Sequence, residues 1–386
     1  MGVHFLPGNR LTLLNSGADF FPALIGAIDA AREEVHLETY IFEADDAGLA
    51  VASALCRAAR RGVRVRVLVD GFGAPDFAHT LMPDLVAEGV QALVYRPELA
   101  RFRLRRHRLR RLHRKITVVD GRIAFVGGIN IIDDLNTPQQ TAPRHDYAVR
   151  IEGPLLEPIQ RTVHRLWEIV VWANFRRRYR QPAPSPIHDR PAGQQQAAFV
   201  VRDNLRHRRN IEEAYLDAIR NAREDILIAN AYFLPGHRFR AALAEAAARG
   251  VRVTMLLQGK VEYRLLHYAT QALYGPLLEA GIRIIEYRRS FLHAKVAVVD
   301  QDWATVGSSN IDPFSLLLAR EANVVVKDEK FAGELLQNLE QAMAEGGHEL
   351  LPGPWRRLPL HSRLLRRIAY SLVRLAIGIA GYGASH

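Results

Sequence analysis

His113-Arg-Lys115-Ile-Thr-Val-Val-Asp120 and His293-Ala-Lys295-Val-Ala-Val-Val-Asp300 are two versions of one stretch of sequence. The first continues to Gly127-Gly128-Ile-Asn130 and the second to Gly307-Ser308-Ser309-Asn310. Counted from its histidine, each copy has lysine at +2, aspartate at +7, glycine at +14 and asparagine at +17. Five identities in one register, found twice, exceed what average composition produces by chance and indicate a duplicated unit.

The duplication extends upstream of both motifs. The apolar runs 34–42 and 225–233 are each followed by a helix-like run that ends at Gly62 or Gly250 and by a β-branched run. Glycine is typical of a helix C-terminus and β-branched residues of a strand. Each half then adds another helix and a strand that a glycine precedes. Strands that alternate with helices predict an α/β fold built from two homologous α/β/α halves.

Composition shifts divide the chain into four parts. Residues 1–180 carry the first motif, and residues 181–196 are rich in proline and glutamine, which favours a linker. Residues 197–345 carry the second motif. The Gly346-Gly347 pair opens a basic tail, residues 346–386.

The chain is strongly basic and almost free of cysteine. The 386 residues include 52 lysine and arginine against 41 aspartate and glutamate, a formal net charge of +11 that favours nucleic acid or acidic lipid as a partner. The single cysteine, Cys56, excludes an intrachain disulfide, fits a reducing compartment and is expected in the core. We expect no signal peptide and no transmembrane helix.

Strand geometry places the motif residues. Residues i and i+2 of a strand share a face, so His113 points the same way as Lys115, and His293 the same way as Lys295. The two aspartates lie at odd offsets and point to the other face. We therefore expect Asp120 and Asp300 to complete the motifs in a mainly structural role.

Lysine is scarce, which makes the motif lysines informative. Five of the 52 lysine and arginine residues are lysine. A chain that otherwise uses arginine has lysine at positions 115 and 295, which indicates that arginine does not substitute for lysine there. A compact ammonium beside a histidine suits a phosphate oxygen, and Asn130 and Asn310 add neutral donors. Together they would stabilise the charge of a phosphoryl transition state. A histidine cluster could also bind a metal, but lysine is a poor ligand, so we expect neither metal nor cofactor.

A third element recurs after each motif. Asp146 and Glu321 each begin an apolar run, 33 and 28 residues after their histidines, counted along the chain. A carboxylate beside an imidazole fixes its tautomer and raises its basicity, which is the role we predict for both. The alternative is an ordinary acid at a strand edge.

These motifs resemble the signature of the phospholipase D superfamily, HxKxxxxD followed by a GG or GS segment and asparagine, over residues 10 to 345 or so. The resemblance implies two phospholipase D-like halves related by a pseudo-two-fold axis, with one active site at their interface. It also implies covalent catalysis without metal, in which His113 attacks phosphorus and His293 is the acid and base.

Three details resemble bacterial cardiolipin synthases that lack N-terminal membrane spans. They are Gly127-Gly128, the segment from Asp146 to Pro154, and the run from Asn310 to Asn323. Gly128 lacks the hydroxyl that Ser308 supplies, so the halves should differ chemically. The resemblance implies transfer of a phosphatidyl group between two phosphatidylglycerol molecules, with release of glycerol, at the cytoplasmic face of the inner membrane.

Two basic segments favour a lipid partner over nucleic acid. Residues 101–111 contain seven arginines with interleaved apolar residues, typical of an anion-attracting lip or of a solvated loop. Residues 361–380 are expected to form an amphipathic helix, which predicts membrane association or a helix docked on the core. Its polar face carries Arg363, Arg366, Arg367, Ser371 and Arg374.

Two other functions fit the same residues. A phospholipase D or a nuclease-type phosphodiesterase would use this site with water as the acceptor. A basic binding protein with an inactive site is a third alternative, against which both intact motifs argue. The sequence does not indicate an oligomeric state.

Overall fold

The computed structural model describes residues 3–97, 111–137, 143–174, 179, 185–203, 207–261, 263–312, 319–356 and 359–380. The first half forms, in chain order, β1 (Leu6–Asn15), α1 (Ser16–Ala30), β2 (Glu34–Thr39), α2 (Asp46–Arg60), β3 (Arg64–Asp70), α3 (Leu81–Ala87), β4 (Gln91–Tyr95), β5 (Lys115–Val119), β6 (Ile123–Gly127), β7 (Tyr147–Glu152) and α4 (Leu156–Ala173).

The second half repeats this order and adds a C-terminal extension. It forms β8 (Gln195–Arg202), α5 (Asn210–Asn221), β9 (Asp225–Asn230), α6 (His237–Ala248), β10 (Arg252–Gln258), α7 (Arg264–Gln271), α8 (Tyr274–Glu279), β11 (Arg283–Tyr287), β12 (Lys295–Val299), β13 (Trp303–Gly307), β14 (Glu321–Lys327), α10 (Glu329–Gly346), β15 (Gly347–Glu349), α11 (Pro352–Arg356) and α12 (Leu360–Ala380).

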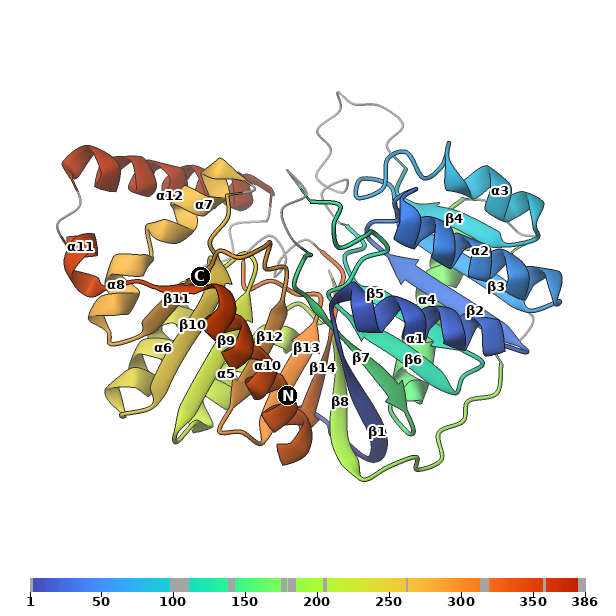
Figure 1. The fold of residues 1–386 in the computed structure, drawn as a ribbon, viewed down its shortest axis with the longest axis horizontal. Coiled ribbons are helices and arrows are strands. Elements are labelled where there is room, and N and C mark those ends of the chain that lie inside the picture. Colours follow the sequence, from blue (N-terminus) through green and yellow to red (C-terminus); the bar gives the residue numbers. More distant parts are fainter. Residues whose placement is uncertain are drawn as a thin grey trace.

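The strands of the described residues form one sheet with a mirrored order. From one edge it runs β15-β11-β10-β9-β12-β13-β14-β8 and then β1-β7-β6-β5-β2-β3-β4. Within each half, β2–β3–β4 and β9–β10–β11 pair in parallel, and the motif strands β5 and β12 pair antiparallel with β2 and β9. The antiparallel pair β1–β8 joins the halves at the centre (Figure 1). This order confirms the predicted α/β fold of two homologous halves related by a pseudo-two-fold axis.

Glycine ends equivalent helices in the two halves. Gly62 follows α2 with φ +86° and Gly250 follows α6 with φ +93°, a left-handed conformation that side chains rarely adopt. The β-branched runs that follow form β3 and β10, which are buried almost throughout.

One hydrophobic core is shared between the halves. It joins Val118 and Val149 of the first half to Leu227 and Val298 of the second, with Phe331 of α10 packed against them. Further clusters lie within each half, between its helices and its own sheet. The shared cluster holds the two halves as one body, so their facing loops keep a defined geometry.

Parts of the predicted linker and tail pack against the halves. Ser185 donates to the carboxylate of Glu34, and β15 pairs antiparallel with β11. The four-part division of the chain remains a prediction. A membrane-spanning helix needs about 20 consecutive apolar residues, and none of the helices in the described part of the chain meets that requirement.

The motif aspartates bind backbone at the far end of the motif strands. Asp120 adopts φ +51° after β5, and its carboxylate accepts from the N–H groups of Arg32, Glu33 and Glu34, each at 2.8 Å. Asp300 repeats this after β12, accepting from three successive N–H groups, 223–225, at 2.8–3.0 Å. Each aspartate therefore ties its hairpin turn to the start of the neighbouring strand.

We expect Asp120→Ala to lower the free energy of unfolding by about 2–3 kcal/mol, because three backbone N–H groups, one of them buried, lose their acceptor and alanine disfavours this left-handed position. Asp120→Asn keeps an acceptor oxygen and tolerates this φ, so it should lose less. Urea denaturation followed by circular dichroism measures both. Asp217→Ala on α5, an exposed site, is the matched control, and equal losses at both positions would contradict the assignment.

Candidate active site

The first motif is bonded to the second half through its backbone. The N–H groups of His113 and Arg114 both donate to the carbonyl of Arg320, at 3.0 and 2.9 Å, and the N–H of Arg320 donates to the carbonyl of Arg111 at 2.7 Å. Because Glu321 directly follows Arg320, this bridge brings the acid of the second half to the histidine of the first. His113 Nδ1 lies 3.0 and 3.1 Å from the two carboxylate oxygens of Glu321.

The second motif is bonded to the first half in the same way. The N–H of His293 donates to the carbonyl of His145 at 2.8 Å, and the N–H of His145 donates to the carbonyl of Phe291 at 2.9 Å. Asp146 follows His145, and its Oδ2 lies 2.5 Å from His293 Nδ1. The carboxylate–imidazole pairs are therefore crossed, since each joins an acid of one half to the histidine of the other.

The motif lysines are more deeply buried than the motif histidines. Lys115 and Lys295 are almost fully buried, and each Nζ donates to the backbone carbonyl of its own motif histidine. Lys295 Nζ also lies 2.8 Å from His293 Nδ1 and 3.5 Å from Asp146 Oδ2. The two imidazoles keep 16% and 19% of their side chains exposed. An anion can thus reach the histidines from outside while the ammonium groups remain in low dielectric, where their charge acts strongly.

Gly128 in the first half and Ser308 in the second stand at equivalent positions but make different contacts. Ser308 Oγ donates to Glu321 and accepts from the N–H of Ala322 at 3.1 Å, so it supports the carboxylate that holds His113. Its counterpart Gly128 lies against Asp146, and a Cβ there would stand 2.3 Å from Asp146 Oδ1. A serine at 128 does not fit beside Asp146 as it is placed.

The asparagines lie after the strands that follow each motif, and both are buried. Asn130 Oδ1 accepts from the N–H of Ile41 at 3.1 Å, which ties the first segment to the end of β2. Asn310 Oδ1 is buried without a hydrogen-bond partner among the described residues.

Burial dominates the electrostatics of the site. It lowers the pKa of His113, which Lys115 lowers further and Glu321 opposes. Burial and Lys295 lower the pKa of His293 to about 3, against the effect of Asp146. Burial also lowers the pKa of Lys115 to about 7. Burial therefore favours the neutral form of both imidazoles, and the carboxylate at each Nδ1 favours the tautomer with the proton on Nδ1 and the lone pair on Nε2.

Most of the sequence-predicted residues lie together, and two do not. The histidines, lysines, Asp146, Glu321 and Ser308 share one site, whereas Asp120 and Asp300 bind backbone at the other end of β5 and β12. Residues 101–110 of the predicted arginine lip lie outside the described residues.

Sequence reasoning missed Tyr40, which follows β2. Its ring centroid lies 4.8 Å from that of His113, and Lys115 Nζ lies 5.4 Å from the ring centroid of Tyr40. Its position in the sequence could have pointed to it, because Tyr40 directly follows β2, the neighbour of the motif strand β5. The equivalent residue of the second half is Ala231.

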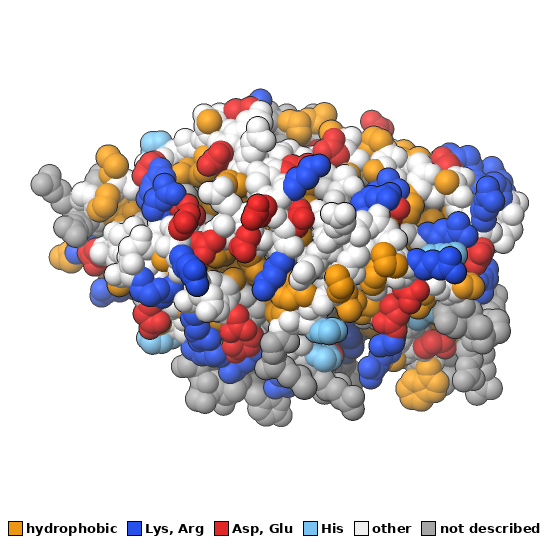
Figure 2. All heavy atoms as spheres, turned by 90° about the horizontal axis from the view of Figure 1, so that it is seen from below, with side chains coloured by type: hydrophobic (Ala, Val, Ile, Leu, Met, Phe, Trp, Pro, Cys, Tyr) orange, Lys and Arg blue, Asp and Glu red, His pale blue; other side chains and the backbone are white. Residues whose placement is uncertain are grey.

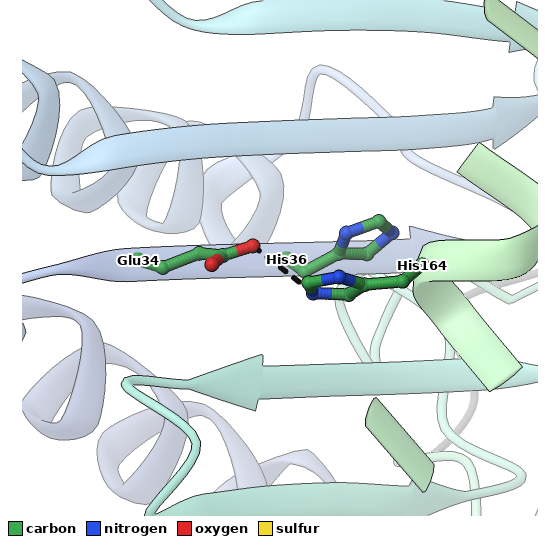
Figure 3. A group of neighbouring side chains, drawn as sticks. All are labelled: Glu34, His36 and His164. Carbon is green, nitrogen blue, oxygen red and sulfur yellow. Dashed lines mark ion pairs between the residues drawn. The ribbon is translucent and has the colours of Figure 1, made fainter. Parts of the chain in front are cut away.

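A separate buried cluster could suggest a metal site. Glu34 and His36 on β2 and His164 on α4 bring their donor atoms within 4.8 Å of one another (Figure 3). However, Arg66 and Ser185 already donate to the carboxylate of Glu34. A guanidinium on the same carboxylate opposes a cation there, so this trio is better described as part of a buried ion-pair network.

Comparison with known sequences identifies close relatives. A family model described as "Cardiolipin synthase, PLD-like domain" matches residues 24–167 and 215–343. Cardiolipin synthase B of Escherichia coli strain K12 is 42% identical over 337 residues, which cover 87% of this chain and 81% of that protein. Cardiolipin synthase B of Salmonella typhimurium is 41% identical over 334 residues, or 86% of this chain and 80% of that protein.

Comparison with solved structures finds the same fold in more distant proteins. Phosphatidylserine synthase from Haemophilus influenzae has a TM-score of 0.72 at 14% identity, covering 97% of this chain and 96% of that one. Polyphosphate kinase from Porphyromonas gingivalis has a TM-score of 0.56 at 14% identity, covering 95% of this chain and 53% of that one. At this identity, the likeness shows a shared fold alone.

We expect Glu321→Gln to lower the pKa of His113 further, because the carboxylate raises that pKa and the neutral amide does not. The measurement is an NMR titration of protein with labelled histidine, assigned with His113→Gln. Asp146→Asn is the matched control and should leave the His113 titration in place. A shift of His113 in Asp146→Asn and none in Glu321→Gln would contradict the crossed pairing.

Proposed function

Because this chain belongs to the family of cardiolipin synthases with phospholipase D-like domains, we propose that it is a phosphatidyltransferase that converts two phosphatidylglycerol molecules into cardiolipin and glycerol. The crossed pairs His113–Glu321 and His293–Asp146 are the observation that carries the chemistry. Each carboxylate orients its imidazole by Nδ1, which leaves two Nε2 atoms for one phosphodiester.

In the first step His113 is the nucleophile, as the family resemblance implies. Its Nε2 attacks phosphorus and forms a P–N bond while the P–O bond to glycerol breaks. The leaving oxygen takes a proton from His293. Burial favours the neutral form of both imidazoles in the unliganded site, but the negative phosphodiester favours the protonated form of a neighbouring imidazole, so substrate binding itself prepares the acid.

In the second step the acceptor hydroxyl of another phosphatidylglycerol gives its proton to His293. Its oxygen attacks phosphorus, the P–N bond breaks, and His113 is released unchanged. The negative substrate favours the protonated forms of the buried Lys115 and Lys295, which then stabilise the added negative charge in both steps. The protein thus needs only its own side chains for this route.

Membrane association is the second part of the proposal, and α12 supports it. Its large aliphatic side chains are exposed, Leu364 at 59% and Leu375 at 60%, with Leu365, Ile368 and Leu372 beside them. The helix does dock on the core, but through Ala369, Tyr370 and Val373. Docking through another face leaves the aliphatic face open, as a helix lying in a lipid interface requires.

The surroundings of α12 fit an anionic membrane surface. Arg363 and Arg367 are exposed on the same helix, and Arg366 donates to Gln271 of the adjacent α7 (Figure 1). On the opposite side, seen from below, acidic and basic side chains are interspersed (Figure 2). We place the enzyme at the cytoplasmic face of the inner membrane, with the α12 side toward lipid.

Product analysis tests the reaction. Purified protein in phosphatidylglycerol micelles with excess EDTA should produce cardiolipin and glycerol in equal amounts, measured by mass spectrometry. His113→Ala and His293→Ala should each reduce the rate by at least about a thousandfold, since each removes a group needed in both steps. Phosphatidic acid and glycerol without cardiolipin would mean that water is the acceptor, and unconverted lipid would reject the proposal.

A donor with a nitrophenyl leaving group separates the two histidines. This leaving group needs no proton, so His293→Ala should release about one equivalent of nitrophenolate and retain the phosphatidyl group, whereas His113→Ala should release none. The reverse pattern would exchange the two roles.

Vesicle binding tests the role of α12. Replacing Leu364, Ile368 and Leu372 with asparagine should weaken binding to phosphatidylglycerol vesicles at least about tenfold, because each aliphatic side chain that enters lipid contributes roughly 1.5–3 kcal/mol. Thermal unfolding should change little, since these side chains are exposed. Leu49→Asn on α2 is the control, and unaltered binding of the triple variant would reject this part of the proposal.

A further inference from the structure

Equivalent side chains fix the segment before each motif histidine. At the end of β3, the carboxylate of Asp70 accepts from the N–H groups of Leu112, at 2.7 Å, and Phe72, at 2.9 Å. At the end of β10, Gln258 Oε1 accepts from the N–H groups of Leu292 and Lys260, both at 3.3 Å. Phe72 and Lys260 therefore occupy the same place in the two halves, each held beside its motif.

In both halves a cation lies over an aromatic ring at this place. The position that carries the cation in one half carries the ring in the other. In the first half, Arg111 Cζ lies 4.4 Å from the ring centroid of Phe72. In the second half, Lys260 Nζ lies 5.8 Å from the ring centroid of Phe291. Arg111 and Phe291 are equivalent, since each stands two residues before its histidine. Each half thus holds a cation against an aromatic ring at the segment that precedes its histidine, although the position that supplies the cation changes.

Lys260 lies just after the end of β10, close to the second motif. It is half-buried beside a hollow lined by Tyr232, Gln258, Tyr263 and His267. Gln258 links it to the backbone directly before His293. Lys260 therefore stands on the His293 side of the site and outside the buried pair of motif lysines.

The proposed reaction needs a second anion-binding group on that side. Lys115 and Lys295 serve the phosphate at which bonds break, but the acceptor phosphatidylglycerol carries a phosphate of its own. Its hydroxyl must approach His293, and a single glycerol bridge separates that hydroxyl from its phosphate. Resting on the proposed function, we infer that Lys260 binds the phosphodiester of the acceptor lipid and so selects a lipid hydroxyl over water.

Lysine suits this role because its ammonium is a compact point charge on a flexible stem, able to follow a phosphate that moves as the hydroxyl approaches. It is one of five lysines in a chain with 52 basic residues. Two of the others are the motif lysines, so the rare residue type gathers around this site.

The test compares two acceptors for one covalent intermediate. Lys260→Met keeps the apolar stem against Phe291 and removes the charge. Cardiolipin formation from phosphatidylglycerol micelles reports an acceptor with a phosphate. Incorporation of labelled free glycerol into phosphatidylglycerol reports an acceptor without one. We expect Lys260→Met to lower the first rate about tenfold or more, since a contact to a charged group is lost, and the second by less than about twofold.

Charge and position have separate controls. Lys260→Arg should recover a large part of cardiolipin formation, because it restores the cation. Lys327→Met, which removes a cation 4.8 Å from the ring centroid of Phe5 at an exposed position away from the motifs, should change neither rate.

The outcomes distinguish this inference from the proposed function. Equal loss of both rates in Lys260→Met, or loss of neither, overturns the role of Lys260 and leaves the reaction intact. A wild-type protein that exchanges glycerol but forms no cardiolipin overturns both.

Discussion

The crossing of carboxylate and imidazole between the halves is the constraint on which the rest of the site depends. Neither half contains a complete pair, because the acid that orients His113 is Glu321 and the acid that orients His293 is Asp146. Buried ionisable groups are costly unless they are paired, so the halves must meet in one register. The shared apolar core and the backbone bridges through Arg320 and His145 provide that register.

Near-symmetry with local departures explains how one site can hold two unlike histidines. Ser308 supports Glu321, while Gly128 leaves room for Asp146. Tyr40 lies against His113, and Ala231 stands at the corresponding position of the second half. A two-step reaction needs a nucleophile and an acid–base group with different surroundings, and these few substitutions supply the difference without changing the fold.

The sequence predicted the fold well and the contacts of the site less well. Motif spacing and glycine-terminated helices placed the strands of both halves, because local pattern and chain order determine them. The spacings from each histidine to the next acid suggested pairs within a half. The pairs in contact instead join the halves: Asp146 and His293 are 147 residues apart in sequence, and His113 and Glu321 are 208 apart. Periodicity also separated the two faces of the last helix, but it did not reveal that the docked stripe contains Ala369 and Tyr370. Such contacts depend on tertiary packing, which short-range pattern does not encode.

The order of synthesis gives the crossed pairs a further meaning. While the first half emerges from the ribosome, His113 is present and Glu321 has not yet been made. Contacts over such long sequence separations form late in folding, after the local helices and hairpins. A nascent chain therefore carries His113 without its orienting partner, and its capacity to cleave lipid arises only when β14 of the second half closes on the first half.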